Sequence, residues 1–205
     1  MIRGIYVIAD NSIVPDKSHL ELAKSALDGG AKIIQFRAKD LNRREFYKIA
    51  LGLARLCQGY QALLIINDQL EIALDAGAGG VHLGADDLAV ERAKLLAPNL
   101  LIGRSTHSLD EAIEVEKSGA DYLAFGAIFP TQTKGRPTPI QGIEQLKEVC
   151  AKVKKPVVAI GGIKRENLAE IKRAGASAAA FISEIVCADS ISGRVRELIK
   201  IWQES

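Results

Sequence analysis

The chain has 205 residues, 48% of them hydrophobic and 25% charged, which suits a globular protein with one sizeable core. Its formal net charge of +2 argues against a broad basic surface for nucleic acid. No apolar run approaches the roughly 18 residues of a membrane span, and the N-terminal "MIRGIYVIADNS" has too short an apolar run for a secretory signal. We expect a cytoplasmic protein that binds neither nucleic acid nor membrane. The sequence leaves its oligomeric state open, a homo-oligomer included.

Short apolar runs alternate with amphipathic stretches along the whole chain. We expect strands, in chain order, over residues 4–10, 32–38, 62–68, 80–85, 100–106, 122–128, 156–162 and 178–183. Helices are expected between them, for example over residues 19–30, 44–58, 88–97, 109–120 and 166–176. The strands are almost continuously apolar, as in a parallel sheet covered on both faces. Eight strand–helix units predict that residues 1–205 form a single α/β domain, a (β/α)8 TIM barrel.

A weak internal repeat favours the closed barrel over an open doubly wound sheet, which is the alternative. The segments "GGAKII", "GAGGVHL", "SGADYLAF" and "AGASAAAFI" recur where the chain enters every second strand. In each, a glycine can end the preceding helix in a left-handed conformation. The three cysteines, Cys57, Cys150 and Cys187, are too widely spaced for a disulfide framework or a zinc site. We expect them to be reduced thiols, packed mostly on helices.

Polar residues gather at the predicted C-terminal ends of the strands, where such barrels carry their chemistry. In "QFRAKD", strand alternation places Gln35, Arg37 and Lys39 on one face. Buried charges need a partner, so an anion is expected opposite them. The other strand ends contribute Asn67, Asp68, Asp86, Asp87, Ser105, His107, Thr131, Thr133, Lys134, Gly161, Gly162, Ile182 and Ser183.

These residues fall into two groups by chemistry. Cations and hydrogen-bonding groups beside two carboxylates, Asp68 and Asp87, suggest a polyphosphate bridged by Mg²⁺, which favours oxygen ligands. The loops "AIGGI" and "FISEI" after the last two strands offer backbone N–H groups of the kind that bind a phosphate. The sequence therefore predicts two anion sites and small phosphorylated substrates.

Each group also has a structural interpretation. Arg37 and Lys39 could pair with Asp68 or Asp40 across the strand ends. Asp86, or less readily Asp87, could cap the helix that follows it. His82 is best read as a hydrogen-bonded core residue, whereas His107 could be a general acid or base, or a helix cap. Thr133 and Lys134 could be ordinary loop residues.

Over nearly its whole length the sequence resembles the thiamine-phosphate synthase family. The resemblance is carried by "QFRAKD", "IIND", "GVHLGADD", "IGRSTHS", "GADYLAFGAIFPTQTK", "VVAIGGI" and "FISEI". It implies a Mg²⁺-dependent (β/α)8 transferase that joins a hydroxymethylpyrimidine diphosphate to a thiazole phosphate. Diphosphate leaves, and the thiazole nitrogen captures the pyrimidine methylene.

The resemblance also implies a role for each matching position. Arg37, Lys39, Asn67 and Lys134 resemble diphosphate ligands, and Asp68 and Asp87 resemble Mg²⁺ ligands. Gln35 and Ser105 resemble residues near the pyrimidine and its diphosphate, and Ser105 and Lys134 take the catalytic roles. Thr131 and Thr133 resemble a loop over the thiazole, while Gly162, Ile182 and Ser183 resemble the cradle of its phosphate.

The sequence departs from the family pattern at Ala85, where the family usually has Gln. In addition, "IGRSTHS" resembles a sister branch, the thiazole tautomerases, which look to use a histidine in "FGH". This chain has Ala127 at that place, and His107 would have to act as the base. A tautomerase and a non-catalytic binder of phosphorylated ligands are therefore the alternatives.

Overall fold

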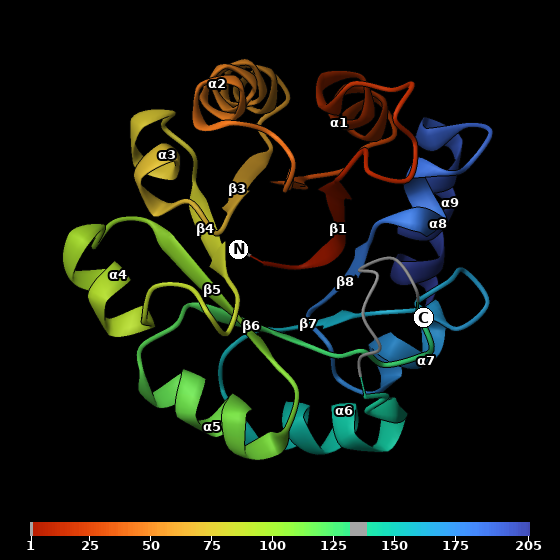
Figure 1. The fold of residues 1–205 in the computed structure, drawn as a ribbon. Helices are drawn as coiled ribbons and strands as arrows, with labels where there is room; N and C mark the ends of the chain where they lie inside the picture. The colour runs from red at the N-terminus through yellow and green to blue at the C-terminus, as the bar shows by residue number, and fades with distance from the viewer. Residues whose placement is uncertain (1, 132–138) are drawn as a thin grey trace.

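Eight parallel strands close into a barrel, in chain order, in the computed structural model, which describes residues 2–131 and 139–205 (Figure 1). The strands are β1 (Gly4–Ala9), β2 (Ile33–Phe36), β3 (Leu63–Asn67), β4 (Gly80–Leu83), β5 (Leu101–Thr106), β6 (Tyr122–Phe125), β7 (Val157–Ile160) and β8 (Ala178–Phe181). The barrel closes where β1 pairs with β8, Gly4 lying opposite Ala178. The predicted (β/α)8 barrel is confirmed, and the open sheet is excluded.

Most strands end earlier than the apolar runs predict. The run 156–162 yields only Val157–Ile160. Gly161 and Gly162 have φ angles of 97° and 65°, which an extended strand cannot contain. Likewise β2 ends at Phe36, so Arg37 begins the loop that follows.

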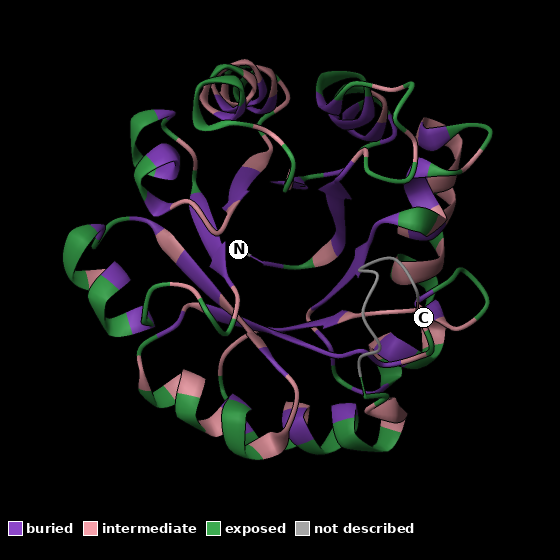
Figure 2. Cartoon of the chain, viewed as in Figure 1, coloured by how far each residue is buried: buried purple, intermediate pink, exposed green. Residues whose placement is uncertain are grey.

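A ring of helices surrounds the barrel (Figure 1). In the described ranges they are α1 (His19–Asp28), α2 (Arg43–Gly59), α3 (Leu70–Asp75), α4 (Val90–Leu96), α5 (Leu109–Lys117), α6 (Gly142–Lys152), α7 (Leu168–Arg173), α8 (Ser183–Val186) and α9 (Ile191–Glu204). Their inner faces are buried and their outer faces exposed (Figure 2), the pattern that amphipathic sequences produce. The last helix, α9, packs on α1, α7 and β1.

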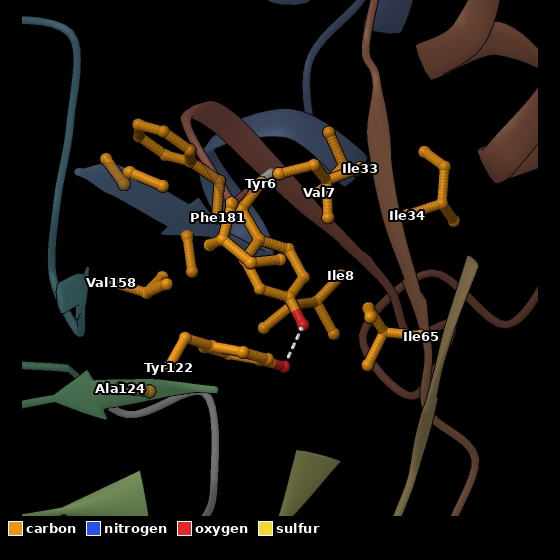
Figure 3. Close-up of a cluster of buried hydrophobic side chains, with 14 of the residues drawn as sticks. Tyr6, Val7, Ile8, Ile33, Ile34, Ile65, Tyr122, Ala124, Val158 and Phe181 are labelled. Atoms are coloured by element: carbon orange, nitrogen blue, oxygen red, sulfur yellow. Dashed lines mark hydrogen bonds between the residues drawn. The ribbon is translucent and has the colours of Figure 1, made fainter. Parts of the chain in front are cut away.

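Side chains from opposite strands fill the barrel (Figure 3). Most are aliphatic, so burying them supplies the driving force for closure. Tyr6 and Tyr122 are exceptions, because each brings a hydroxyl into the interior. Their hydroxyl oxygens lie 3.0 Å apart, which satisfies both buried groups.

None of the described helices is long and apolar enough to cross a membrane. All three cysteines are free thiols. Cys57 is buried on α2, Cys150 is half-buried on α6, and Cys187 is exposed just after α8.

Candidate active site

Two adjoining cavities lie at the C-terminal ends of the strands. The larger, of about 630 Å³, is lined by residues of all eight strands, and its Asp, Lys and Arg side chains follow β2, β3 and β4. The smaller, of about 510 Å³, is bordered by the loops after β6, β7 and β8. Both are lined by Ser105, His107, Ile160, Ala180 and Ile182. Two ligands could therefore occupy neighbouring sites and meet at this common wall.

The structure gathers the predicted site residues around these two cavities. The larger is lined by Gln35, Arg37, Lys39, Asn67, Asp68, Asp87 and Ser105. The smaller is lined by Thr131, Gly162, Ile182 and Ser183, again with Ser105. Thr133 and Lys134 lie outside the described residues. The ligands assigned to the predicted site residues stay a prediction.

Arg37 is held at the cavity wall by an ion pair with Asp10, a residue that the sequence reasoning missed. The Arg37 side chain is 13% exposed and that of Asp10 only 3%. Burial opposes ionisation of Asp10, but hydrogen bonds from Ser12 and the charge of Arg37 outweigh it and lower the pKa of its carboxyl. Arg37 thus pairs with Asp10 rather than with Asp40 or Asp68, the alternative predicted for it. Its position could have indicated Asp10 as a site residue, because it directly follows β1 just as Asp68 directly follows β3.

Asp68 and Asp87 bring two carboxylates together at the edge of the larger cavity. Burial raises the pKa of Asp68 to about 6, and the adjacent Asp87 adds to this, while the charges of Lys39 and Arg37 partly offset it. Crowded carboxylates of this kind attract a cation. In residues 2–131 and 139–205, no group of three or more His, Cys, Asp or Glu side chains could hold a metal ion. A cation here would need further ligands from substrate or water, as Mg²⁺ commonly does.

The loop that carries Asp87 is fixed without a helix cap. Helix α4 begins at Val90 after Ala89, which makes no side-chain cap, so the helix-cap interpretation of Asp86 and Asp87 is wrong. Asp86 is exposed, and Asp87 Oδ2 instead accepts a hydrogen bond from the backbone N–H of Gly84, at 2.6 Å. The turn thus uses one carboxylate oxygen of Asp87, and the Asp87 carboxyl also hydrogen-bonds to that of Asp68.

The same loop is tied to β5 by Arg104. Its guanidinium donates to the carbonyls of Ala85 and Leu88, both at 3.0 Å. These contacts use backbone atoms, so they do not depend on which side chain stands at position 85. Ala85 is therefore compatible with this anchoring of the loop.

The two histidines near the site differ in their surroundings. His82 is buried, with Nδ1 3.1 Å from the Tyr122 hydroxyl and Nε2 3.0 Å from Ser105 Oγ. Its interpretation as a hydrogen-bonded core residue is confirmed. His107 is half-exposed, lines both cavities and lies 3.3 Å from Glu111, whose carboxylate also accepts its backbone N–H. Its side chain is anchored to the start of α5, whose N-cap is Ser108.

The smaller cavity includes two glycines, Gly161 and Gly162, beside side chains such as those of Lys164 and Phe181. A Cβ at Gly162 would lie 2.6 Å from the Pro130 carbonyl oxygen, and one at Gly161 would lie 2.6 Å from Ala127 Cβ. Only glycine lets these loops approach so closely. Ala127, at the place of the tautomerase histidine, contributes a methyl group to this cavity. The cavity is therefore suited to binding an anion through N–H groups, and Ala127 supplies no base.

Comparisons with a family profile and with individual proteins point to the same family. The profile of the family described as thiamine monophosphate synthase matches residues 5–185. The thiamine-phosphate synthase of Pyrococcus furiosus is 43% identical over 200 residues, covering 98% of this chain and 95% of that protein. That of Methanospirillum hungatei is 43% identical over 203 residues, covering 98% of each.

Solved structures agree with the sequence comparison. The thiamine phosphate pyrophosphorylase structure from Pyrococcus furiosus superposes with a TM-score of 0.91 at 41% identity, covering 98% of this chain and 96% of that one. A 3-hexulose-6-phosphate synthase, at 18% identity and a TM-score of 0.73, shares the fold alone. With a profile match over most of its length and relatives of this similarity, the chain belongs to the thiamine monophosphate synthase family.

Proposed function

We propose that the protein is a Mg²⁺-dependent transferase that joins a hydroxymethylpyrimidine diphosphate to a thiazole phosphate. The products are thiamine phosphate and diphosphate. The observation that carries this assignment is the pair of adjoining cavities, one lined by cations and carboxylates and the other containing the turn at Gly161 and Gly162. It is supported by membership of the family and by relatives named thiamine-phosphate synthase.

In this assignment the larger cavity takes the pyrimidine diphosphate. Arg37 and Lys39 offset the charge of the diphosphate, and Asn67 and Ser105 supply hydrogen bonds. Asp68 and Asp87 would hold Mg²⁺, which when bound neutralises charge on the leaving diphosphate. Because Asp10 already fixes Arg37, its guanidinium needs little reorganisation as charge develops.

The smaller cavity takes the thiazole phosphate. Backbone N–H groups near Gly162, Ile182 and Ser183 would bind its phosphate, and Thr131 lines the same cavity. The bond from the pyrimidine methylene to the diphosphate oxygen breaks, and the thiazole nitrogen supplies the electron pair for the new C–N bond. The common wall at Ser105 is where the two reacting ends would meet.

A coupled-substrate assay tests the proposal. Purified protein is mixed with both substrates, with Mg²⁺ or with a chelator, and thiamine phosphate is measured. We expect metal-dependent product and a loss of about 10²-fold or more in kcat/KM for Asp68→Ala. Asp75→Ala, an exposed carboxylate at the end of α3, is the matched control and should keep full activity.

The other outcomes separate the alternatives. Isomerisation of a thiazole carboxy phosphate without thiamine phosphate would indicate a tautomerase. Binding of both ligands without turnover would indicate a non-catalytic binder. Full activity in Asp68→Ala would contradict the proposed metal site, whichever reaction is found.

A further inference from the structure

A chain of side-chain hydrogen bonds crosses the barrel beneath the larger cavity. Gln35 Nε2 donates to the Tyr6 hydroxyl at 2.9 Å, and the Tyr6 and Tyr122 hydroxyls, which face each other in Figure 3, lie 3.0 Å apart. Tyr122 then contacts His82 Nδ1 at 3.1 Å, and His82 Nε2 contacts Ser105 Oγ at 3.0 Å. Five strands are thereby linked to one hydroxyl on the common wall of the two cavities.

Tyr122 is the member of this chain that does not line a cavity. It is fully buried, and its ring stacks on that of His82 with centroids 5.6 Å apart. The other side of the ring is confined by β5, because a Cβ at Gly103 would come within 2.0 Å of Tyr122 Cζ. The hydroxyl of Tyr122 is therefore fixed in place by packing.

The donor at one end sets the direction of the whole chain. Since Tyr6 accepts from Gln35, its own hydrogen can go to Tyr122, and the Tyr122 hydrogen can go to His82 Nδ1. Burial raises the pKa of both tyrosines, so both stay protonated donors. The reverse order would leave the buried Tyr6 hydrogen without an acceptor in the chain, which is unfavourable for a buried donor.

We propose that Tyr122 is a positioning residue for Ser105. By donating to His82 Nδ1 it keeps the imidazole hydrogen on Nε2, which donates to Ser105 Oγ. The Ser105 hydrogen is then left to donate into the cavity. The inference rests on the proposed function, in which Ser105 contacts the diphosphate end of the pyrimidine substrate.

The tautomer of His82 can be measured without turnover. In ¹⁵N NMR of histidine-labelled protein we expect His82 to carry hydrogen on Nε2 and none on Nδ1. In Tyr122→Phe, which keeps the ring and removes the hydroxyl, Nδ1 loses its donor, so the two tautomers should mix. Hydrogen on Nδ1 alone in the unmodified protein would overturn the proposal, even if Tyr122→Phe failed to fold.

Kinetics provide the second test. We expect Tyr122→Phe to lower kcat about tenfold, the effect of roughly one hydrogen bond, without changing KM for the thiazole phosphate. Tyr47→Phe removes the hydroxyl of a half-buried tyrosine on α2 and should leave both constants unchanged.

The Ser105→Ala background distinguishes positioning from a general loss of packing. If Tyr122 acts through Ser105, adding Tyr122→Phe to Ser105→Ala should lower kcat no further. Two losses that multiply would overturn the proposal. A negative synthase assay with hydrogen on His82 Nε2 would instead contradict the proposed function and leave the hydrogen-bond assignment standing.

Discussion

Asp68 shows how a single residue can serve the site at the expense of the fold. Its carboxyl is half-buried beside Asp87, and its backbone has a φ of 64°, in the left-handed region. Its raised pKa means that the folded protein binds a proton more tightly than the unfolded chain does. Ionising Asp68 therefore lowers the free energy of unfolding as the pH rises from about 4 through about 6.

Asp68→Asn should consequently stabilise the protein when no metal is bound. Asn tolerates a left-handed backbone, so the change removes only the charge. We expect the free energy of unfolding at pH 7.5 to rise on the order of 1 kcal/mol, reduced by solvent screening because the group is half-exposed. Near pH 4 the gain should vanish, because Asp68 is then protonated in the folded state.

Urea unfolding at the two pH values measures this difference. Asp75→Asn, which changes an exposed carboxylate on α3, should have little effect at either pH. An equal gain at pH 4 and pH 7.5 would show that the charge of Asp68 is not the cause.

At this scale the sequence located the cavity residues but not all of their partners. Strand alternation placed Gln35, Arg37 and Lys39 around one cavity, because the period of two persists just beyond β2. Asp10 was missed because its contact with Arg37 depends on the pairing of β1 with β2, 27 positions apart in sequence. The sequence pattern of a single strand does not indicate which residue after a neighbouring strand will contact it.

Among the elements, the packing of α1 against α9 depends on one glycine. Gly29 follows α1 with an ordinary φ of −78°, so its backbone does not require glycine. The limited space does require glycine, because an added Cβ would lie 2.7 Å from the carbonyl oxygen of Ser192 and 2.8 Å from Val195 Cβ. A side chain at this position would push the two helices apart.

Gly29→Ala should therefore lower the free energy of unfolding by about 1–3 kcal/mol, the usual cost of overpacking. Gly59→Ala is a matched control, because it ends α2 and a Cβ there meets nothing within 4 Å. That change should be neutral or stabilise by up to about 1 kcal/mol, since alanine favours a helix over glycine. Equal unfolding midpoints for the two variants would contradict the close packing of α1 on α9.

Element types were easier to predict from sequence than element ends. Apolar runs gave all eight strands, because every one is covered by helices outside and side chains inside. Their ends were placed too late where glycine turns the chain, as at Gly161. The expected cap before α4 was wrong because Asp87 bonds to Gly84 within its own loop; both arrangements satisfy a carboxylate, and sequence does not choose between them.

At the scale of the whole molecule, closure of the barrel brings residues of its two halves together at one site. The ends of β2 to β4 supply the charged groups of the larger cavity, and the loops after β6 to β8 supply the backbone of the smaller one. Pairing of β1 with β8 holds the two halves in register (Figure 1). Binding in the charged half should therefore stabilise the entire barrel, because the strands of both halves belong to one closed sheet.

Thermal unfolding with inorganic diphosphate tests this coupling. At a ligand concentration about a hundred times Kd, binding adds about 2.7 kcal/mol to the free energy of unfolding. For a chain of this size that should raise Tm by roughly 5–10 °C.

Lys39→Gln, which removes a cation from the larger cavity, should shrink the Tm shift, whereas Lys48→Gln on the exposed face of α2 should not. Added salt should shrink it too, by screening the exposed Lys39 charge. If Lys39→Gln leaves the Tm shift unchanged, the diphosphate binds outside this cavity. If a chelator leaves the Tm shift unchanged, binding needs no metal.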